Sequence, residues 1–527
     1  MPQPACRHLI LILGDQLDED SAAFDGFDAA IDVVLMIEAR EESTHVWSSK
    51  ARTVLFLSAM RHFAQGLRDR GWRVAYRAMD SEDDATLADG MRAAHEIYRP
   101  ERVLGVEPGD QRVRLQIESA IQSIADLSDA TRAKPSKPSM TWREDRHFLC
   151  SLPQFRRWAG QSASLRMEFF YRSMRQQYKV LMDGAKPAGG QWNFDAENRK
   201  GFGKTGPQHV PRPPVFATDA ITREVIALVE QQLGGHPGDL GRFNWPVTRE
   251  QALVALSDFI THRLPDFGRH QDAMWTGLDF GWHALLSSSL NLKLLNPLEV
   301  VQAAENAYRS RDLDLASVEG FIRQVLGWRE FMRGVYFLDM PDLKTANHFG
   351  HERPLPAWYW TGDTHLNCMR QCISQTLANG YSHHIQRLMV TGMFGVTAQL
   401  SPQAVCDWYL AVYVDAVEWV ELPNTAGMAL FANGGRFTSK PYVASGAYVK
   451  RMSNYCTDCR YQPETRSGPG ACPMTTLYWH FLDQHEAAFS ANPRTALMVK
   501  HLKGMAAADR EQLRSDAQAM LADLDSL

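Results

Sequence analysis

Three cysteines near the end of the chain have a spacing that suits metal chemistry. Cys456 and Cys459 are separated by two residues, and Cys472 follows after twelve more. A two-residue gap lets both thiolates reach one metal centre without strain, and a distant fourth ligand would complete a tetrahedral zinc site or an iron–sulfur cluster. The candidates for the fourth ligand are Cys368, Cys372 and Cys406.

The identity of the metal is open between iron and zinc, and a group of ordinary buried thiols is the third alternative. Short zinc sites normally use two Cys-x2-Cys pairs, and only one such pair is present. Cys472 is followed by Pro473, as in many iron–sulfur loops. The pattern therefore favours iron. The uneven spacing of the eight cysteines predicts no disulfide framework.

A second group of candidates lies on a helix expected over residues 319–337, EGFIRQVLGWREFMRGVYF. Arg323, Arg329 and Arg333 stand among apolar and aromatic residues. A buried arginine normally needs an anion, and the phosphates of a cofactor would serve. The alternative is an amphipathic core helix that is rich in aromatic residues.

The segment 381–390, YSHHIQRLMV, places His383, His384 and Arg387 within about one helical turn. Imidazole is suited to proton transfer near neutral pH, although a core histidine with satisfied hydrogen bonds is the alternative. Asp415 follows the next helical pattern and is a candidate ion-pair partner of Arg387.

Three aromatic residues have the chemistry of an electron relay. Trp408 and Tyr409 are adjacent, and Trp360 ends the run Trp358-Tyr359-Trp360. Ordinary core packing is the alternative for all of them.

Length and composition place these candidates in a globular protein of at least two domains. A chain of 527 residues exceeds one ordinary core. The net charge of -5 argues against a generally basic coat, but it allows one basic face. There is no apolar run of bilayer length, and the five apolar residues after His8 are too few for a signal peptide. We expect a cytoplasmic protein.

The elements that position the candidates fall into two classes. Apolar runs predict strands at residues 8–13, 32–37, 73–77 and 102–106, and a helical pattern covers 48–70. This alternation predicts a doubly wound parallel sheet with ligands at the carboxyl ends of its strands. The polar and small residues at those ends include Gly14, Asp15, Glu42 and Gly109.

The rest of the chain predicts a connector followed by helices. Residues 133–138 and 184–214 are rich in Pro, Gly and polar residues, and the pattern is helical from about residue 218. The expected architecture is an α/β domain (1–135), a linker (136–217) and an all-α domain (218–527). No G-x-G-x-x-G follows the first strand, and residues 198–205 only mimic the end of a phosphate-binding loop.

Several long strings resemble one protein family. FIRQVLGWREF, HHIQRLMV and VDAVEWVELPN are similar to the flavin-binding domain of photolyases and cryptochromes. GGQWNFDAENR and SKPYVASGAYVKRMSNYCTDCRY resemble the bacterial iron–sulfur subgroup, which includes (6-4) photolyases. The resemblance extends from LILGDQL near the start to the last cysteine. It implies an N-terminal antenna domain, a long linker and a helical domain that holds U-shaped FAD.

The resemblance also implies cofactor contacts. A [4Fe–4S] cluster would be bound by Cys368, Cys456, Cys459 and Cys472. Leu286 and Ser287 resemble a phosphate-contacting element, although Ser288 replaces its usual proline. Gln324 and Arg329 would contact the phosphates and ribityl chain, Arg387 and Asp415 would lie beside the isoalloxazine, and Glu421 would lie near flavin N5.

The implied activity is light-driven repair of (6-4) photoproducts in UV-damaged DNA, in which excited reduced flavin donates an electron. His384 is the expected acid, with His383 as its neighbour or partner, because imidazole can donate a proton near neutral pH. Cyclobutane-specific relatives carry Asn at the His384 position, which favours (6-4) specificity. The resemblance implies that Trp408, Trp360 and Tyr409 relay electrons.

The expected DNA contacts are Lys440, Lys450 and Arg451, with Tyr442 in the lesion pocket. The subgroup's usual antenna, 6,7-dimethyl-8-ribityllumazine, would lie at Gly14, Asp15, Glu42 and Gly109. We expect a monomer without membrane contacts. There are two competing hypotheses. One is a cryptochrome-like photoreceptor with the same cofactors, and the other is a non-catalytic DNA-binding protein stabilised by a structural zinc site.

Overall fold

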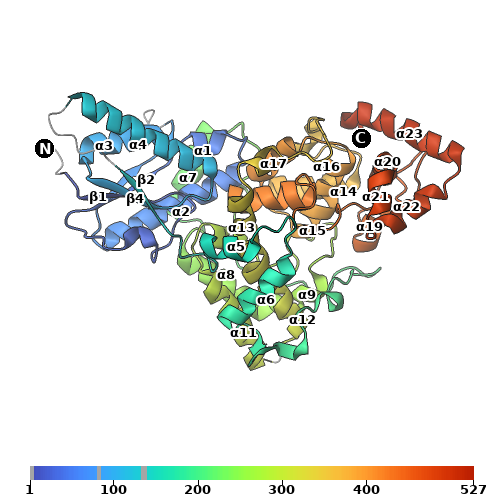
Figure 1. Ribbon diagram of the computed structural model, residues 1–527, viewed down its shortest axis with the longest axis horizontal. Coiled ribbons are helices and arrows are strands. Elements are labelled where there is room, and N and C mark those ends of the chain that lie inside the picture. The colour runs from blue at the N-terminus through green and yellow to red at the C-terminus, as the bar shows by residue number, and fades with distance from the viewer. Residues whose placement is uncertain (1–4, 80–84, 132–138, 312) are drawn as a thin grey trace.

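The computed structural model describes residues 5–79, 85–131, 139–311 and 313–527. An α/β part at the N-terminus adjoins a larger helical part, and the C-terminal helices lie at the opposite end of the molecule (Figure 1). The predicted boundary between residues 135 and 136 lies outside the described residues.

A five-stranded parallel sheet forms the centre of the N-terminal part. Its spatial order is β3-β2-β1-β4-β5. In the register of the central strand, Leu9 pairs with Val33 on one side and with Val103 on the other. The predicted doubly wound sheet is therefore confirmed. The strands are β1 (His8–Leu11), β2 (Val33–Ile37), β3 (Val74–Arg77), β4 (Arg102–Val106) and β5 (Met140–Arg143).

β5 was not predicted, and it lies in the stretch that the sequence assigned to the linker. It pairs with β4 at the edge of the sheet, where Val103 lies opposite Met140. None of its four residues is fully buried. An edge strand of this kind lacks the continuous apolar run that marks a buried parallel strand.

Helices cover the sheet, and side-chain caps mark the start of several of them. Ser49 accepts a hydrogen bond from Arg52 N at the start of α2 (Lys50–Asp69). Thr86 and Asp89 form a capping box at α3 (Leu87–Tyr98). α7 (Ala220–Gln232), the first helix after the connector, packs against α2. The other helices of this part are α1 (Glu41–Thr44) and α4 (Gln111–Thr131).

The remaining chain is almost entirely helical, as predicted. Its helices are α5 (Leu152–Ala159), α6 (Met167–Tyr178), α8 (Arg249–Asp258), α9 (Leu264–His270), α10 (Ser287–Asn291), α11 (Pro297–Arg311), α12 (Leu315–Ile322), α13 (Glu330–Asp339), α14 (Asn367–Asn379), α15 (His384–Gln386), α16 (Met393–Thr397), α17 (Pro402–Val412), α18 (Glu418–Leu422), α19 (Gly446–Met452), α20 (Pro473–Gln484), α21 (Glu486–Ala491), α22 (Ala496–Lys503) and α23 (Ala507–Ala522). Four segments are π-helical: η4 (Phe259–Arg263), η5 (Arg323–Arg329), η8 (Arg387–Gly392) and η9 (Pro423–Ala429).

The stretch expected to be a linker carries structure of its own. α5 packs against α13, and α6 packs against η5. Phe155 of α5 and Phe170 of α6 are buried beside Phe331 of α13. The first helices after the sheet are therefore part of the helical core.

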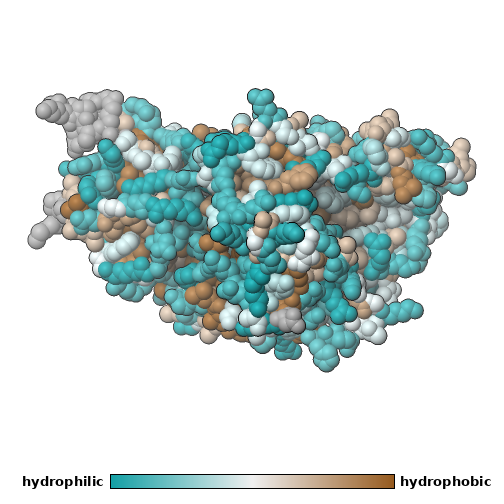
Figure 2. Space-filling view, turned by 60° about the horizontal axis from the view of Figure 1, so that its bottom comes forward, coloured by the Kyte–Doolittle hydropathy of each residue, from teal (hydrophilic) through white to brown (hydrophobic). Residues whose placement is uncertain are grey.

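The face of the molecule that Figure 2 presents is mostly polar. The face in Figure 2 shows hydrophobic residues in scattered small areas. None of the helices in the described part of the chain has the length and apolar character that crossing a bilayer requires.

Candidate functional site

The helical part surrounds a cavity of about 600 Å³, which is within the usual range of ligand sites. Three of the four π-helical segments, η5, η8 and η9, contribute to its wall. Such turns often occur at functional sites. The predicted residues that line the cavity are Leu286, Ser287, Gln324, Arg329, His384, Arg387, Tyr409, Asp415, Glu421 and Tyr442.

The expected ion pair of Arg387 and Asp415 is confirmed. Arg387 donates from Nη1 to Asp415 Oδ1 at 2.9 Å and from Nη2 to Oδ2 at 3.2 Å. Its Nε donates to Ser382 O at 2.7 Å, and its guanidinium lies 3.7 Å from the ring centre of Tyr413. Three donors and an aromatic face fix this cation in the cavity wall.

α10 supports the same carboxylate. Ser287 Oγ donates to Asp415 Oδ2 at 2.6 Å, and Asn291 Nδ2 donates to Asp415 O at 2.7 Å. Asn291 also lines the cavity. The sequence prediction missed Asn291, because only the fold brings α10 to the end of α17.

Carboxylates of the chain pair with two of the three buried arginines that were expected to need an anion. Arg323 donates from Nε to Glu319 Oε1 at 3.1 Å, and Arg329 donates from Nη1 to Glu330 Oε1 at 2.9 Å. Arg333 has no carboxylate in hydrogen-bond contact among the described residues.

Arg333 instead donates to Cys150 O at 3.2 Å and lies 4.0 Å from the ring centre of Phe148. Arg329 lines the cavity, and its buried Nε has no hydrogen-bond partner in the described part of the chain.

Two polar side chains present amide and carboxyl groups to the cavity. Gln324 Nε2 donates to Gly320 O at 3.1 Å. Glu421 is buried, and its Oε1 has no partner among the described residues. Burial raises the pKa of Glu421 well above its usual value, which favours the protonated carboxyl.

The two adjacent histidines lie in different surroundings. His384 begins α15 and is exposed to the cavity, whereas His383 is buried and is not part of the wall. The ring of His383 stacks on His283, with centres 4.5 Å apart and planes at 11°. Desolvation, followed by the charges of Arg387 and Arg199, lowers the pKa of His384 to about 4.

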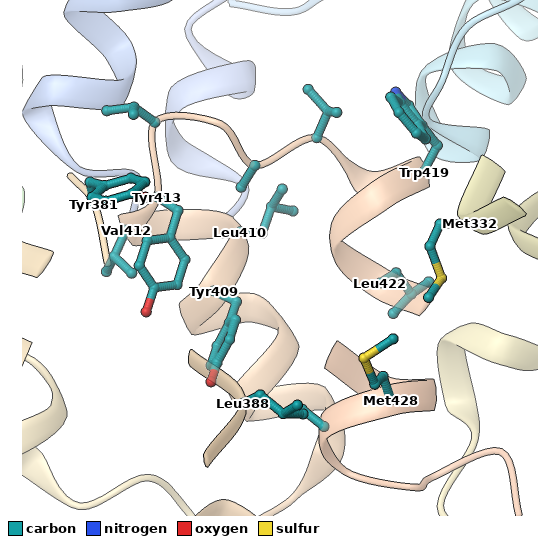
Figure 3. Packing of buried hydrophobic residues seen from close by; sticks show 14 of the residues in the cluster. Met332, Tyr381, Leu388, Tyr409, Leu410, Val412, Tyr413, Trp419, Leu422 and Met428 are labelled. Carbon is teal, nitrogen blue, oxygen red and sulfur yellow. The ribbon is translucent and has the colours of Figure 1, made fainter. Parts of the chain in front are cut away.

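The predicted redox aromatics are in successive contact. Trp408 is fully buried, and its ring centre lies 5.4 Å from Tyr409 and 6.5 Å from Trp360. Tyr409 and Tyr413 lie side by side at the end of α17 (Figure 3), and both line the cavity.

The aromatic series continues to the surface through a residue that the sequence prediction missed. Trp47 of the α/β part lies 4.8 Å from Trp360, and 46% of it is exposed. The sequence around Trp47 does not indicate a role in the aromatic series, because Trp360, the ring that it contacts, is more than 300 positions away.

The predicted lesion and DNA residues differ in their surroundings. Tyr442 lines the cavity, and Arg199 does so from the connector. Lys450 pairs with exposed Glu464 at 3.1 Å, and Arg451 lies 5.3 Å from the ring centre of Tyr448. Lys440 has no ion-pair partner among the described residues.

A second, smaller cavity of about 110 Å³ lies at the carboxyl ends of β1, β2 and β4. The four predicted antenna residues, Gly14, Asp15, Glu42 and Gly109, all contribute to its wall. Val417 and Glu418 of the helical part close its other side. The cavity therefore lies between the two parts.

The predicted antenna residues differ in their charge, hydrogen bonds and packing. Burial raises the pKa of Asp15 to about 6, and Glu42 accepts two hydrogen bonds of 2.9 Å from Arg112. A Cβ on Gly109 would come within 2.4 Å of Trp419. Gly109 thus permits close packing of the helical part as well as lining the cavity. Arg52, which the sequence prediction missed, is buried in the wall, and no carboxylate of the described residues is in hydrogen-bond contact with it.

The four predicted cluster cysteines approach one another. Cys368 of α14 lies within electrostatic reach of the other three thiols, and burial followed by the Cys472 charge raises its pKa well above the usual value. In the described part of the chain, no group of three or more His, Cys, Asp or Glu is arranged to hold a single metal ion.

Comparison with known proteins gives the family. Residues 10–245 match the model of the deoxyribodipyrimidine photo-lyase-related proteins. The chain is 45% identical over 519 residues to a (6-4) photolyase from Agrobacterium fabrum, covering 98% of this chain and 99% of that protein. The chain belongs to the (6-4) photolyase family.

The solved structures show that the chain has the photolyase/cryptochrome fold. A bacterial class III photolyase from Agrobacterium tumefaciens aligns with a TM-score of 0.56 at 14% identity, over 99% of this chain and 98% of that one. A cryptochrome from Synechocystis aligns with a TM-score of 0.55 at 12% identity, over 97% of this chain and 94% of that one.

Proposed function

We propose that this protein repairs (6-4) pyrimidine photoproducts in UV-damaged DNA with light, using FAD. The observation that carries the proposal is the large cavity, in which His384 is exposed near the Arg387–Asp415 pair. An extruded base needs both a hollow and groups that transfer protons and electrons. The relatedness to a (6-4) photolyase over nearly the whole chain supports the same activity.

The cavity fits FAD in size and in chemistry. Its wall is mainly apolar and aromatic, with a few polar atoms that have no partner within the described residues, among them Arg329 Nε and Glu421 Oε1. Ligand pockets have this composition. When bound, FAD would supply the light-absorbing electron donor. The residues that would hold it are Leu286, Ser287, Gln324, Arg329, Arg387, Asp415 and Glu421.

His384 would hold the proton that the lesion needs when a hydroxyl or amino group returns to its original base. Arg387 and Arg199 lower the pKa of its imidazole, and an anion bound nearby would oppose that effect. His383 would position His384 by capping α15, since Gln386 Oε1 accepts a hydrogen bond from its backbone N–H at 3.0 Å.

The aromatic series would carry electrons between the cavity and the surface. Tyr409, Trp408 and Trp360 are the predicted members, and Trp47 would be the exposed end. Close ring contacts along the whole series support this role.

The smaller cavity would hold the antenna, 6,7-dimethyl-8-ribityllumazine, against Gly14, Asp15, Glu42 and Gly109. The buried guanidinium of Arg52 supports a polar ligand, because it donates to Ala416 O and Ser48 Oγ and, within the part of the chain that the structure describes, to no carboxylate.

A [4Fe–4S] cluster would be bound by Cys368, Cys456, Cys459 and Cys472. The donor set fits a cluster, because iron–sulfur clusters take four thiolates and the four thiols interact electrostatically. A mononuclear zinc site would need its sulfurs about 2.3 Å from one ion.

Lesion repair can be tested with purified protein and oligonucleotides that carry defined photoproducts. Under blue light the protein should remove (6-4) products. His384→Ala should keep bound FAD, measured by absorbance, and lose repair. His262→Ala, at an exposed position on η4, is the matched control.

Normal repair by His384→Ala would remove this residue from the mechanism. Flavin photoreduction without repair of any lesion in the unaltered protein would favour the cryptochrome-like photoreceptor.

A further inference from the structure

One loop forms part of the cavity wall and is held in place by the C-terminal helices. This loop, residues 438–445, carries Tyr442, which lines the cavity. Asn492 Nδ2 donates to Ser439 O at 3.1 Å, and Arg494 Nη1 donates to Ser439 Oγ at 2.8 Å. The turn between α21 and α22 therefore lies directly beside the cavity wall.

Arg494 carries a positive charge that the protein does not neutralise. It is exposed, and no carboxylate within the described residues pairs with it. Of its five N–H donors, one is used by Ser439. Arg199 differs, because Asp195 and Asp272 lie 2.7 Å and 3.4 Å from its guanidinium.

Arg494 reaches the loop of the cavity wall through Ser439, which precedes Tyr442 by three positions. Burial raises the pKa of the Tyr442 hydroxyl, and the charges of Arg199 and Arg494 oppose that effect. Arg199 lines the cavity together with Tyr442, and Arg494 is bound to Ser439 of the Tyr442 loop. Lys440, next to Ser439 in the same loop, adds another cation without an ion-pair partner in the described part of the chain.

We propose that Arg494, held by Ser439, binds a DNA backbone phosphate beside the extruded base, so that the turn between α21 and α22 is part of the DNA interface. A guanidinium anchored through one donor can offer the others to phosphate oxygens. This inference rests on the proposed function. The turn between α21 and α22 is marked by no motif in the sequence. Through Arg494 and Ser439 it would connect the Tyr442 loop to the bound DNA strand.

The phosphate contact can be tested by the salt dependence of DNA binding. Each phosphate contact adds about 0.9 to the slope of log affinity against log salt. For the FAD-containing protein, the dissociation constant is measured from 50 to 200 mM salt, with undamaged duplex and with duplex carrying one (6-4) lesion. The variants are Arg494→Gln and Arg494→Lys.

Lys503→Ala is the matched control. Lys503 is an exposed cation on α22, but it already lies 3.9 Å from Glu486. We expect Arg494→Gln to reduce the slope by about one for both duplexes. Arg494→Lys should keep the slope, because it keeps the charge, and Lys503→Ala should match the unaltered protein.

Three outcomes would overturn the inference. An unchanged slope in Arg494→Gln would show that no phosphate is bound there. A loss confined to the lesion duplex would indicate contact with the lesion instead of the backbone. An equal loss in Lys503→Ala would show that any surface cation has the same effect. Failure of the unaltered protein to bind DNA would instead contradict the proposed function.

Discussion

At the scale of single residues, the cavity holds a carboxyl group that should be neutral. Glu421 is buried, and its pKa is raised well above the usual value, mainly by desolvation. The folded state therefore keeps a proton that the unfolded state loses above about pH 4.3. A group of this kind lowers stability as pH rises, because the folded state binds more protons than the unfolded state.

Glu421→Gln should remove this dependence while keeping the shape of the side chain. Relative to the unaltered protein, the free energy of unfolding of the variant should rise with pH by up to about 1.4 kcal/mol per unit. Urea unfolding between pH 5 and 8 measures the difference. Glu224→Gln, at an exposed position on α7, is the control. A difference that does not change with pH would show that Glu421 is ionised in the folded protein.

At the scale of elements, close helix packing supports the cavity wall formed by η5. α13 continues directly from η5, and it approaches α5 through Gly334. A Cβ at this position would lie 2.2 Å from Phe155 Cδ2. Phe155 is itself buried among Trp158, Phe170 and Phe331, so it has little freedom to move.

Gly334→Ala should therefore destabilise the protein by about 2 kcal/mol through overpacking. Thermal unfolding measures this as a lower Tm. Gly66→Ala is the matched control, because Gly66 lies inside α2 and a Cβ there meets no atom within 4 Å. That change should raise stability by about 0.5–1 kcal/mol, as expected for Ala in a helix. Equal effects of the two variants would contradict the packing argument.

At the scale of the whole molecule, the proposed cluster would join the C-terminal helices to the helical core. Cys368 lies in α14, whereas Cys472 precedes α20. Metal sites stabilise the loops that supply their ligands. Cys456→Ser should therefore lose the bound iron and lower the Tm, as measured by iron content and thermal unfolding.

Cys372→Ser is the control for that prediction. Cys372 is a buried thiol four residues after Cys368 in the same helix, and the resemblance does not make it a ligand. The Cys372→Ser variant should therefore keep the same iron content as the unaltered protein. Full iron in Cys456→Ser, or loss of iron in Cys372→Ser alone, would contradict the ligand assignment.

The amino-acid sequence determined the main elements and ten of the residues that line the cavity. Apolar runs marked four of the five strands, of which β1, β2 and β4 are largely buried. Helical spacing marked the helices around Arg387 and Trp408. The ion pair of Arg387 and Asp415 could be inferred from residue type and position. Where residue spacing left several candidates, the resemblance chose among them. It favoured Cys368 over Cys372 as the fourth ligand of the cluster.

Only the tertiary structure decided which partners these residues have. It paired Arg323 and Arg329 with carboxylates, separated buried His383 from exposed His384, and added β5 to the sheet. It also placed Trp47 against Trp360 and Arg494 beside the Tyr442 loop. The physical reason is that local patterns record burial and periodicity, whereas these contacts join segments that are distant in the chain and meet only when the helices pack.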